Sequence, residues 1–319
     1  MDKLIIKILS VIDKYQLIEK NQTVLAAVSG GHDSLCMLYL LNEIRKIREF
    51  DLKVMHLNHS FREEADSDME FVKSVSQKLG LEFFCEKVNV EQYAKQNGIS
   101  FETAGRLVRY DFFDRVASQF LHSVIATAHN ANDNIESFFM HLMRGSGLNG
   151  LSGISIKRDN IIRPLLFITR EEIERYCNEK GIVPVLDITN DSDDYTRNDI
   201  RHNVIPAILN RCSIDSLTRT MDIINEENIF FEQYVKSIAK NCIIKYNDVA
   251  KIDIKQFNLL DKAVKRRILY EFLKDGPDVG LIHIDSIIEI ASKNRGGSVS
   301  ELPGGKKIKL NKGMLEIYE

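Results

Sequence analysis

The sequence predicts an α/β fold in which a mainly parallel, twisted sheet carries helices on both faces, followed by a smaller and mostly helical C-terminal domain. Short apolar runs alternate with amphipathic helical stretches through the first part of the chain, and this β-α-β-α order is typical of parallel sheets. From about Ser213 the sequence becomes helical and mixed in charge, and it closes with a strand-like tail at 298–318. We therefore expect a first domain over residues 1–212 and a second over residues 213–319.

The predicted elements can be placed along the chain by their apolar spacing. Strands are expected at 23–28, 52–58, 82–88 and 123–128, and helices at 33–46, 66–79, 100–118 and 132–143, after an amphipathic N-terminal helix. Ser100 is placed to cap its helix. Thr169-x-x-Glu172 is a capping box for a later helix, which Gly181 ends. Ligands of such folds bind beyond the carboxyl ends of the strands, and polar clusters follow three of the four strands.

Composition limits the classes of protein that fit. The 319 residues are 44% hydrophobic with five prolines, which indicates a soluble globular protein and excludes a disordered one. A net charge of −3 excludes histone-like basicity but allows local basic stripes that bind RNA. No segment approaches the ~18 consecutive apolar residues of a membrane span, and the N-terminal helix is too interrupted by charge for a signal peptide. We expect a cytoplasmic protein with no membrane partner.

The five cysteines are scattered along the chain and form no C-x-x-C pair; they are Cys36, Cys85, Cys177, Cys212 and Cys242. This spacing indicates neither a zinc cage nor a cysteine-held iron–sulfur cluster. Scattered single cysteines suit a reducing compartment.

The most informative stretch is a glycine loop that joins a buried strand to the start of a helix; it reads Ser29-Gly30-Gly31-His32-Asp33-Ser34. Adjacent glycines let the backbone approach a ligand, and the loop amides with the helix N-terminus predict an anion site. Asp33 would repel a bare phosphate but fits a divalent cation held between its carboxylate and the phosphates. A plain strand–turn–helix corner is the alternative, although it would not require two serines and an aspartate. Walker and dinucleotide patterns are absent.

A second polar cluster begins with Thr127 and follows the strand at 123–128. Asp133 and Glu136 are three residues apart, so they share one face of the helix's first turn, and His129 lies just before that helix. Two carboxylates near a phosphate loop could bind a metal or an ammonium group. Helix capping and a favourable interaction with the helix dipole would also explain acidic residues here.

Three sets of basic residues are candidates for binding phosphate. Arg106 and Arg109 share a helix face, although an exposed salt-bridging stripe is the commoner fate of such arginines. Arg197 and Arg201 are four residues apart on a predicted helix and present two planar donors together. The third set, Lys265, Arg266 and Arg267, lies in the second domain near a lysine-rich tail. These residues could bind RNA phosphates, or they could form a lysine-rich surface that contacts only solvent.

The glycine loop resembles the S-G-G-x-D-S loop of the PP-loop (N-type) ATP pyrophosphatases, a Rossmann-like superfamily that cleaves ATP between the α and β phosphates and transfers AMP to an oxygen. Further segments at 56–62, 102–113, 127–153 and 194–206 resemble, in order, motifs of the tRNA(Ile)-lysidine synthetase family. The chain departs from that family's usual His, Asp and Gln at Asn130, Asn132 and Asn134.

The resemblance implies an ATP-dependent carbon–nitrogen ligase. Its expected reaction adenylates the wobble cytidine of tRNA(Ile) with a CAU anticodon, and the ε-amine of free L-lysine then attacks. The products are lysidine, AMP and pyrophosphate, which converts AUG to AUA decoding. ATP and Mg²⁺ are the implied cofactors.

The resemblance also implies roles for individual residues. ATP would bind to Ser29, Gly30, Gly31, His32, Asp33 and Ser34, with Asp33 as the metal ligand. Lysine would bind to Asp133 and Glu136. The implied catalytic set is Asp33, Arg109, His129, Asp133, Glu136 and Arg201, and contacts to tRNA or other phosphates fall to Arg106, Arg197, Arg201, Lys265, Arg266 and Arg267.

Two other functions stay open at this point. Another PP-loop tRNA-modifying enzyme, such as a thiolase, commonly needs paired or persulfide-bearing cysteines, and the spacing offers no obvious pair. A catalytically idle tRNA- or nucleotide-binding relative is compatible with the three asparagine departures. The sequence does not fix the oligomeric state, and a homodimer is compatible with it.

Overall fold

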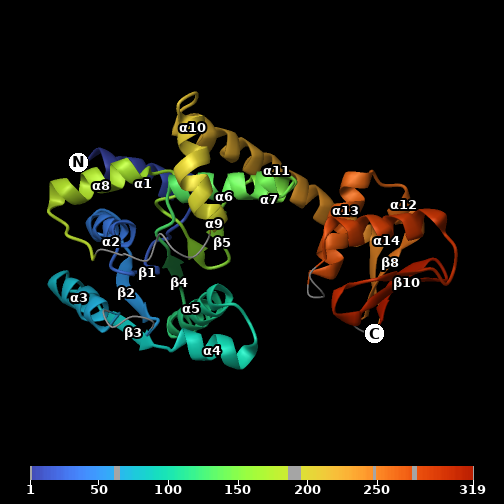
Figure 1. The fold of residues 1–319 in the computed structure, drawn as a ribbon, viewed down its shortest axis with the longest axis horizontal. Helices are drawn as coiled ribbons and strands as arrows, with labels where there is room; N and C mark the ends of the chain where they lie inside the picture. Colours follow the sequence, from blue (N-terminus) through green and yellow to red (C-terminus); the bar gives the residue numbers. More distant parts are fainter. Residues whose placement is uncertain (1, 61–64, 186–194, 247–248, 275–278, 319) are drawn as a thin grey trace. The chain divides into compact units, whose positions relative to one another are not determined.

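The computed structural model describes residues 2–60, 65–185, 195–246, 249–274 and 279–318 (Figure 1). The chain forms two compact units, Met1–Ile224 and Asn225–Glu319. One long helix, α11 (Ile214–Cys242), runs across the division. The domain boundary predicted between residues 212 and 213 therefore lies at the start of this helix, whereas the units divide within it.

The first unit is built on a six-stranded sheet. Its strands are β1 (Thr23–Ala27), β2 (Asp51–Asn58), β3 (Phe83–Lys87), β4 (Ser123–Ala126), β5 (Lys157–Arg158) and β6 (Ile161–Ile162), in the order β3-β2-β1-β4-β6-β5. All neighbours are parallel except the edge pair β5–β6. The mainly parallel sheet is thus confirmed, and the two-residue strands β5 and β6 are additions that no periodicity could have predicted.

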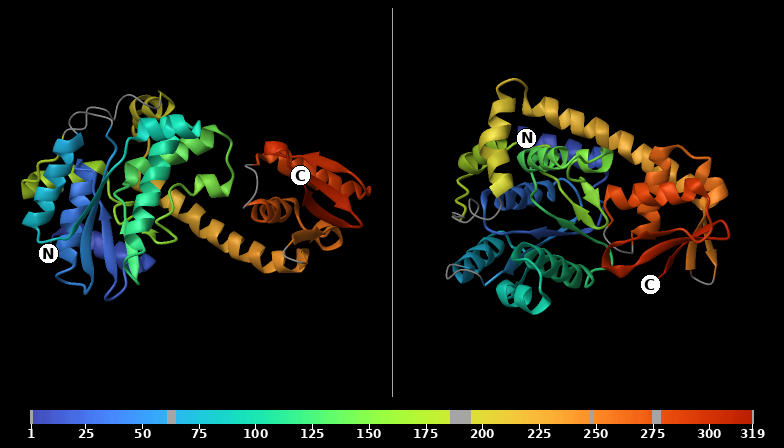
Figure 2. Two further views of the ribbon diagram at one scale, coloured as in Figure 1. Left: turned by 90° about the horizontal axis from the view of Figure 1, so that it is seen from below. Right: turned by 45° about the vertical axis from the view of Figure 1, so that its right-hand side comes forward.

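Helices cover both faces of this sheet, as the sequence predicts (Figures 1 and 2). On one face lie α1 (Lys3–Tyr15), α2 (His32–Ile44), α3 (Ala65–Lys78) and α8 (Arg170–Lys180), and on the other lies α5 (Phe101–Ala117) with α4 (Val90–Asn97) against it. In β1, Val24 packs into the first face and Leu25 into the second. Because both faces are buried, the strand reads as an apolar run rather than an alternation.

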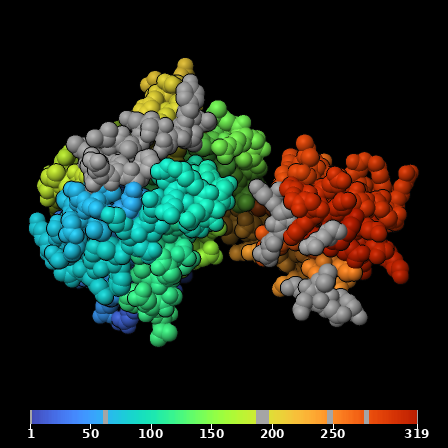
Figure 3. All heavy atoms as spheres, turned by 60° about the horizontal axis from the view of Figure 1, so that its bottom comes forward, coloured from blue at the N-terminus to red at the C-terminus, as the bar shows by residue number. Residues whose placement is uncertain are grey.

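The helix ends follow their local chemistry. The Ser100 hydroxyl accepts from the Thr103 amide at the start of α5. Thr169 and Glu172 form both bonds of the capping box at α8, and Gly181 ends that helix at φ 62°. The residues of α4 were not predicted to be helical. In the space-filling view of Figure 3, the teal residues of α4 and α5 cover their face of the unit.

A third group of helices packs beside the sheet. It comprises α6 (Ala131–Met143), α7 (Leu148–Leu151), α9 (Tyr195–Asp199), the π-helix η2 (Ile200–Val204) and α10 (Ile205–Leu209). Ile135 and Phe139 of α6 share a buried cluster with Ile200, Ile205 and Met221. This cluster brings the chain near residue 200 against α6, and that contact shapes the site described below.

The second unit combines helices with an antiparallel sheet. After α11 come β7 (Ile243–Tyr246), β8 (Val249–Asp253), α12 (Ile254–Asn258), α13 (Lys262–Leu273), α14 (Leu281–Lys293), β9 (Val299–Glu301), η3 (Pro303–Gly305), β10 (Lys307–Asn311) and β11 (Met314–Tyr318). The sheet order is β7-β8-β11-β10-β9. The helical character and the strand-like tail agree with the sequence prediction, while β7 and β8 were not predicted. Across the described ranges, no helix is both long and apolar enough to span a membrane.

Candidate active site

The carboxyl ends of three neighbouring strands bring the predicted segments together. Strand β1 pairs with β4 through Ala26 and Ala126, and β4 pairs with β6 through Ala126 and Ile162. The glycine loop leaves β1 at this edge, the segment from Thr127 leaves β4, and the chain after Ile162 leaves β6. Such an edge is where open parallel sheets bind ligands.

The glycine loop is held in shape by its own serines. The Ser34 hydroxyl accepts from the amides of Ser29 and Gly30, both at 3.2 Å, and donates to the Gly31 carbonyl at 3.0 Å. Gly30 has φ +101°, and a Cβ there would lie 3.4 Å from a methyl of Val72. Glycine is needed at this position because other residues rarely adopt that backbone conformation. The serine hydroxyls, expected to contact phosphate, here bond to the loop itself.

The first turn of α2 offers backbone donors to an anion. Gly31 is its N-cap, and none of the side chains in the described ranges caps it. The first amides of a helix have no partner within the helix, and the helix dipole adds a partial positive charge there. The exposed His32 begins this turn. The loop therefore has the geometry of a phosphate site.

Asp33 and Asp133 lie in the first turns of two helices, α2 and α6. Burial raises the pKa of the Asp33 carboxyl, against the opposing effects of Arg170 and the neighbouring Asn130 amide. Burial also raises the pKa of Asp133, and the charges of Asp33 and Glu136 raise it further. The carboxylate of the glycine loop is thus within electrostatic reach of the acidic pair on α6. Among the described residues, no three acidic, histidine or cysteine side chains form a ready metal site.

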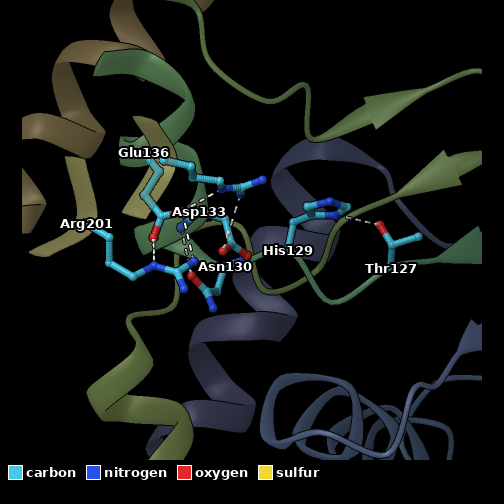
Figure 4. Close-up of polar contacts among 7 residues, drawn as sticks. Thr127, His129, Asn130, Asp133, Glu136 and Arg201 are labelled. Carbon is cyan, nitrogen blue, oxygen red and sulfur yellow. Dashed lines mark hydrogen bonds and ion pairs between the residues drawn. The ribbon is translucent and has the colours of Figure 1, made fainter. Parts of the chain in front are cut away.

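Asn130 and Asp133 form the capping box of α6 (Figure 4). The Asp133 amide donates to Asn130 Oδ1 at 3.0 Å, and the Asn130 amide donates to Asp133 Oδ2 at 3.1 Å. The other oxygen of Asp133 lies 4.0 Å from an Arg197 nitrogen. The capping interpretation of Asp133 therefore holds for one of its oxygens, and the second oxygen has no contact closer than that arginine in the described part of the chain.

Glu136 is 1% exposed and bound by two arginines (Figure 4). Its Oε1 accepts from Arg201 Nε at 2.6 Å, and its Oε2 accepts from Arg197 Nε at 2.9 Å and from Arg201 at 3.0 Å. Burial alone would raise the pKa of Glu136, but the hydrogen bonds from Arg201 and Arg197 hold it below its usual value. Glu136 therefore fixes both guanidinium groups at the site.

The three asparagines that depart from the family pattern each accept a backbone hydrogen bond. Asn130 caps α6, as described above. The Asn132 oxygen accepts from the Arg170 amide at 2.9 Å and so joins α6 to the start of α8. The Asn134 oxygen accepts from the Ile154 amide at 2.7 Å. An amide side chain at these positions therefore has a structural role.

His129 lies among positive charges. Its Nδ1 is 3.1 Å from the Thr127 hydroxyl (Figure 4). Burial lowers the pKa of His129 to about 4, and the charges of Arg163, Arg109 and Arg197 contribute. The imidazole is therefore neutral at pH 7 and able to accept a proton.

Arg106 and Arg109 lie on α5, the helix that packs on the second face of the sheet. Arg106 lies over the Tyr110 ring at 5.8 Å. The surrounding protein lowers the pKa of Arg109 by desolvation, although much of its side-chain surface is exposed. Arg163, which the sequence analysis gave no role, is 6% exposed and contacts Tyr110. The signal that could have pointed to Arg163 is its place directly after β6, a strand too short to recognise.

The predicted basic run of the second unit already has partners there. Lys265 donates to the Asn258 carbonyl, Arg266 pairs with Asp285 at 2.8 Å, and Arg267 pairs with Glu232 at 3.6 Å. These contacts stabilise α13 within its own unit. Contact of this run with tRNA stays a prediction.

Two further sequence-based expectations concern other residues. The imidazole of His56, in the segment 56–62, lies 2.8 Å from the Val28 carbonyl and supports the end of β1, whereas Arg62 lies outside the described residues. The sequence spacing offers no obvious cysteine pair, but packing brings the buried thiols of Cys36 on α2 and Cys177 on α8 into contact. Sequence spacing could not reveal this pair, because it forms where α8 packs on α2.

Comparisons with known proteins identify the family of this chain. The model of the PP-loop domain family matches residues 2–208. A tRNA(Ile)-lysidine synthase of Caldanaerobacter subterraneus subsp. tengcongensis is 38% identical over 90% of this chain and 63% of its own length. A tRNA(Ile)-lysidine synthase from Clostridium acetobutylicum is 35% identical over 96% of this chain and 68% of its own length. The chain thus spans about two-thirds of the length of the curated relatives it matches.

A solved structure supports the fold. A U34-tRNA thiolase from Methanococcus maripaludis superposes with a TM-score of 0.60 over 70% of this chain and 78% of its own, at 19% sequence identity. This likeness concerns the architecture of the sheet and its helices.

Proposed function

We propose that this chain, which belongs to the PP-loop family and within it to the tRNA(Ile)-lysidine synthases, uses ATP to join free L-lysine to the wobble cytidine of a tRNA(Ile) with a CAU anticodon. One observation carries the proposal: Asp33 and Asp133 follow the neighbouring parallel strands β1 and β4 at one edge of the sheet, and the charge of Asp33 acts on Asp133. A nucleotide site and a site for an ammonium group are therefore adjacent.

ATP would bind to the glycine loop with its phosphates at the uncapped start of α2. Asp33 would hold Mg²⁺, since carboxylate oxygens are ligands that this ion prefers. What a bound Mg²⁺ supplies there is neutralisation of phosphate charge. The loop amides orient the nucleotide, and glycine at position 30 lets the backbone come close to it.

The first chemical step would be adenylation of the cytidine. The C2 oxygen of the base attacks the α-phosphorus, and pyrophosphate leaves. Because the base must reach the protein, it has to be splayed out of the anticodon loop. Arg109 and Arg201, with Arg106 and Arg197 near them, would stabilise the charge that develops on the phosphate. The contacts of Glu136 hold Arg197 and Arg201 in place for this role.

The second step would be attack by the ε-amine of lysine at C2, which displaces AMP. Lysine arrives protonated, since its amine has a pKa of about 10.4. Asp133 and Glu136 would hold the ammonium group, with Asp133 the more accessible of the two because both oxygens of Glu136 already accept from arginines. The neutral His129 would receive the proton, and a bound phosphate would raise its pKa by opposing the nearby arginines.

The two alternatives are less well supported. A thiolase would need reactive sulfur, whereas the Cys36 and Cys177 thiols are buried between α2 and α8. The alternative of a catalytically idle relative rested on the three asparagines that depart from the family pattern. Each of them accepts a backbone hydrogen bond, which gives it a structural role, and the chain retains Asp33, His129 and Asp133. A cytoplasmic location and a homodimer stay predictions, open to fractionation and sedimentation experiments.

A pyrophosphate-release assay on this chain tests the proposal. With CAU-anticodon tRNA and ATP we expect release that depends on the tRNA, and lysidine should form only when lysine is added. Release that instead requires a sulfur donor would favour a thiolase. Absence of release under every condition would favour the idle relative and refute the proposal.

A further inference from the structure

Arg163 is a buried cation for which the described residues offer no carboxylate within ion-pair distance. One of its terminal nitrogens donates to the Ser155 carbonyl, and the buried Nε has no hydrogen-bond partner. The Tyr110 side chain also interacts with Arg163. Burying a guanidinium without a counter-charge is unfavourable, so an arginine in this state is suited to meet an anion that arrives with a ligand.

The strand register places Arg163 beside Thr127, the residue that contacts His129. Ala126 pairs with Ile162, and the Thr127 amide donates to the Ile162 carbonyl at 3.0 Å. Thr127 and Arg163 are therefore the next register neighbours on parallel strands. The Thr127 hydroxyl in turn contacts His129. Arg163, Thr127 and His129 thus form one group at the carboxyl ends of β4 and β6.

This group lies on the α5 face of the sheet. Ile125 and Ile161, two residues before Thr127 and Arg163, pack with Phe112 and Phe113 of α5. Since side chains alternate along a strand, Thr127 and Arg163 point to that same face. Arg109 and Tyr110 stand on α5 there, and Tyr110 contacts Arg163.

The charges around His129 are not balanced within the described residues. Arg197 is paired with Glu136, but neither Arg109 nor Arg163 has an acidic partner in the part of the chain that the structure describes. All three arginines act on the His129 imidazole. The buried Arg163 guanidinium, together with one hydroxyl, one imidazole and the nearby charge of the more exposed Arg109, makes a site for a compact, multiply charged oxyanion.

We propose that Arg163, together with Arg109 and the Thr127–His129 pair, binds a phosphate group of a substrate, separately from the amides of the glycine loop. The inference rests on the proposed function and extends it by assigning Arg163 to phosphate binding. The phosphate has two sources, the triphosphate of ATP or the backbone of the anticodon loop. A guanidinium can form two parallel hydrogen bonds to a phosphate, which fixes its orientation as well as its position.

NMR of the His129 ring tests the inference directly. Inorganic pyrophosphate and a CAU anticodon stem-loop RNA serve as separate probes. Binding of a phosphate at this site should raise the pKa of His129 from its low value, and the probe that does so identifies the source. In Arg163→Met we expect the pKa of His129 to rise without any ligand and the affinity for that probe to fall about 10- to 100-fold, as expected for a charged hydrogen bond. If Arg163 had a purely structural role, the probe would shift the pKa of His129 in Arg163→Met as much as in the wild-type chain.

Two variants complete the experiment. Arg48→Met removes an exposed arginine that pairs with Asp13, away from this group, and should leave both the titration and the affinities unchanged. Arg163→Lys keeps the charge and should keep the low pKa of His129 but recover the affinity only in part; it also serves if Arg163→Met fails to fold. If neither probe shifts His129 in the wild-type chain while lysidine still forms, the inference is wrong and the proposed function stands. If neither probe binds and no lysidine forms, both fail.

Discussion

Glu136 of α6 accepts hydrogen bonds on both of its carboxylate oxygens from Arg201, which lies 65 residues later in the chain. Arg197 adds a further bond to the same carboxylate. The buried Glu136 carboxylate binds these two partly exposed arginines and so fixes the segment after residue 195 to the start of α6. The same contact orients two guanidinium groups toward the edge of the sheet where the glycine loop ends.

Glu136→Gln should weaken this attachment. The substitution keeps the side-chain shape but removes the charge that offsets the two arginines. Because Arg201 and Arg197 are 22% and 41% exposed, solvent screens part of the effect, and we expect the free energy of unfolding to fall by about 1–2 kcal/mol. Chemical denaturation measures this loss, and lysidine formation should slow at the same time. The exposed Glu179→Gln is the control. Equal stability of the two variants would contradict the role given to Glu136.

Gly30→Ala should disrupt the glycine loop. Its φ of +101° is strained for alanine, and the new Cβ would lie in contact with Val72, at 3.4 Å. Gly80→Ala is a matched control because Gly80 also has positive φ, at +65°, with open space around it and no place in the site. We expect both to lose about 1–3 kcal/mol of stability, whereas only Gly30→Ala should weaken ATP binding. Calorimetry would refute the loop assignment if the two variants bound ATP equally well.

His129 should make the fold sensitive to mild acid. Its folded pKa of about 4 lies below its ordinary value of 6.5, so the unfolded chain takes up a proton before the folded chain does. The stabilising contribution is complete above about pH 6.5 and is lost as the pH falls toward 4. In His129→Asn this part of the pH dependence should disappear. Thermal melts at several pH values between 6.5 and 4 measure this. If the melting temperatures of the wild-type chain and His129→Asn fell equally with pH, the low pKa of His129 would be contradicted.

Most of the fold could be predicted because its strands are buried on both faces. The apolar runs at 23–28 and 52–58 and the capping box at Thr169 reflect local physics that a sequence displays directly. Strands β5 and β6 were not predicted, because a strand of two residues is too short to show an apolar periodicity. Helix α4 was not predicted from its short sequence.

The site was predictable only where motifs are local. The glycine loop and the Asp133–Glu136 pair are visible in the sequence because each lies within one turn of chain. The pairing of Glu136 with Arg201, the burial of Arg163 and the contact of Cys36 with Cys177 arise from packing between distant segments. The spacing of residues along the chain does not reveal such contacts, so the physical roles of these residues could be assigned only from the structure.

The central claim is that Asp33 and Asp133 serve two successive steps in one site, and a single-turnover experiment with ATP labelled at the α-phosphate tests it most directly. The wild-type chain should form adenylated tRNA without lysine and release AMP when lysine is added. Asp33→Asn should form no adenylated tRNA. Asp133→Asn, which keeps the capping oxygen, should form it but release AMP slowly at limiting lysine. Normal turnover by both folded variants would contradict the account.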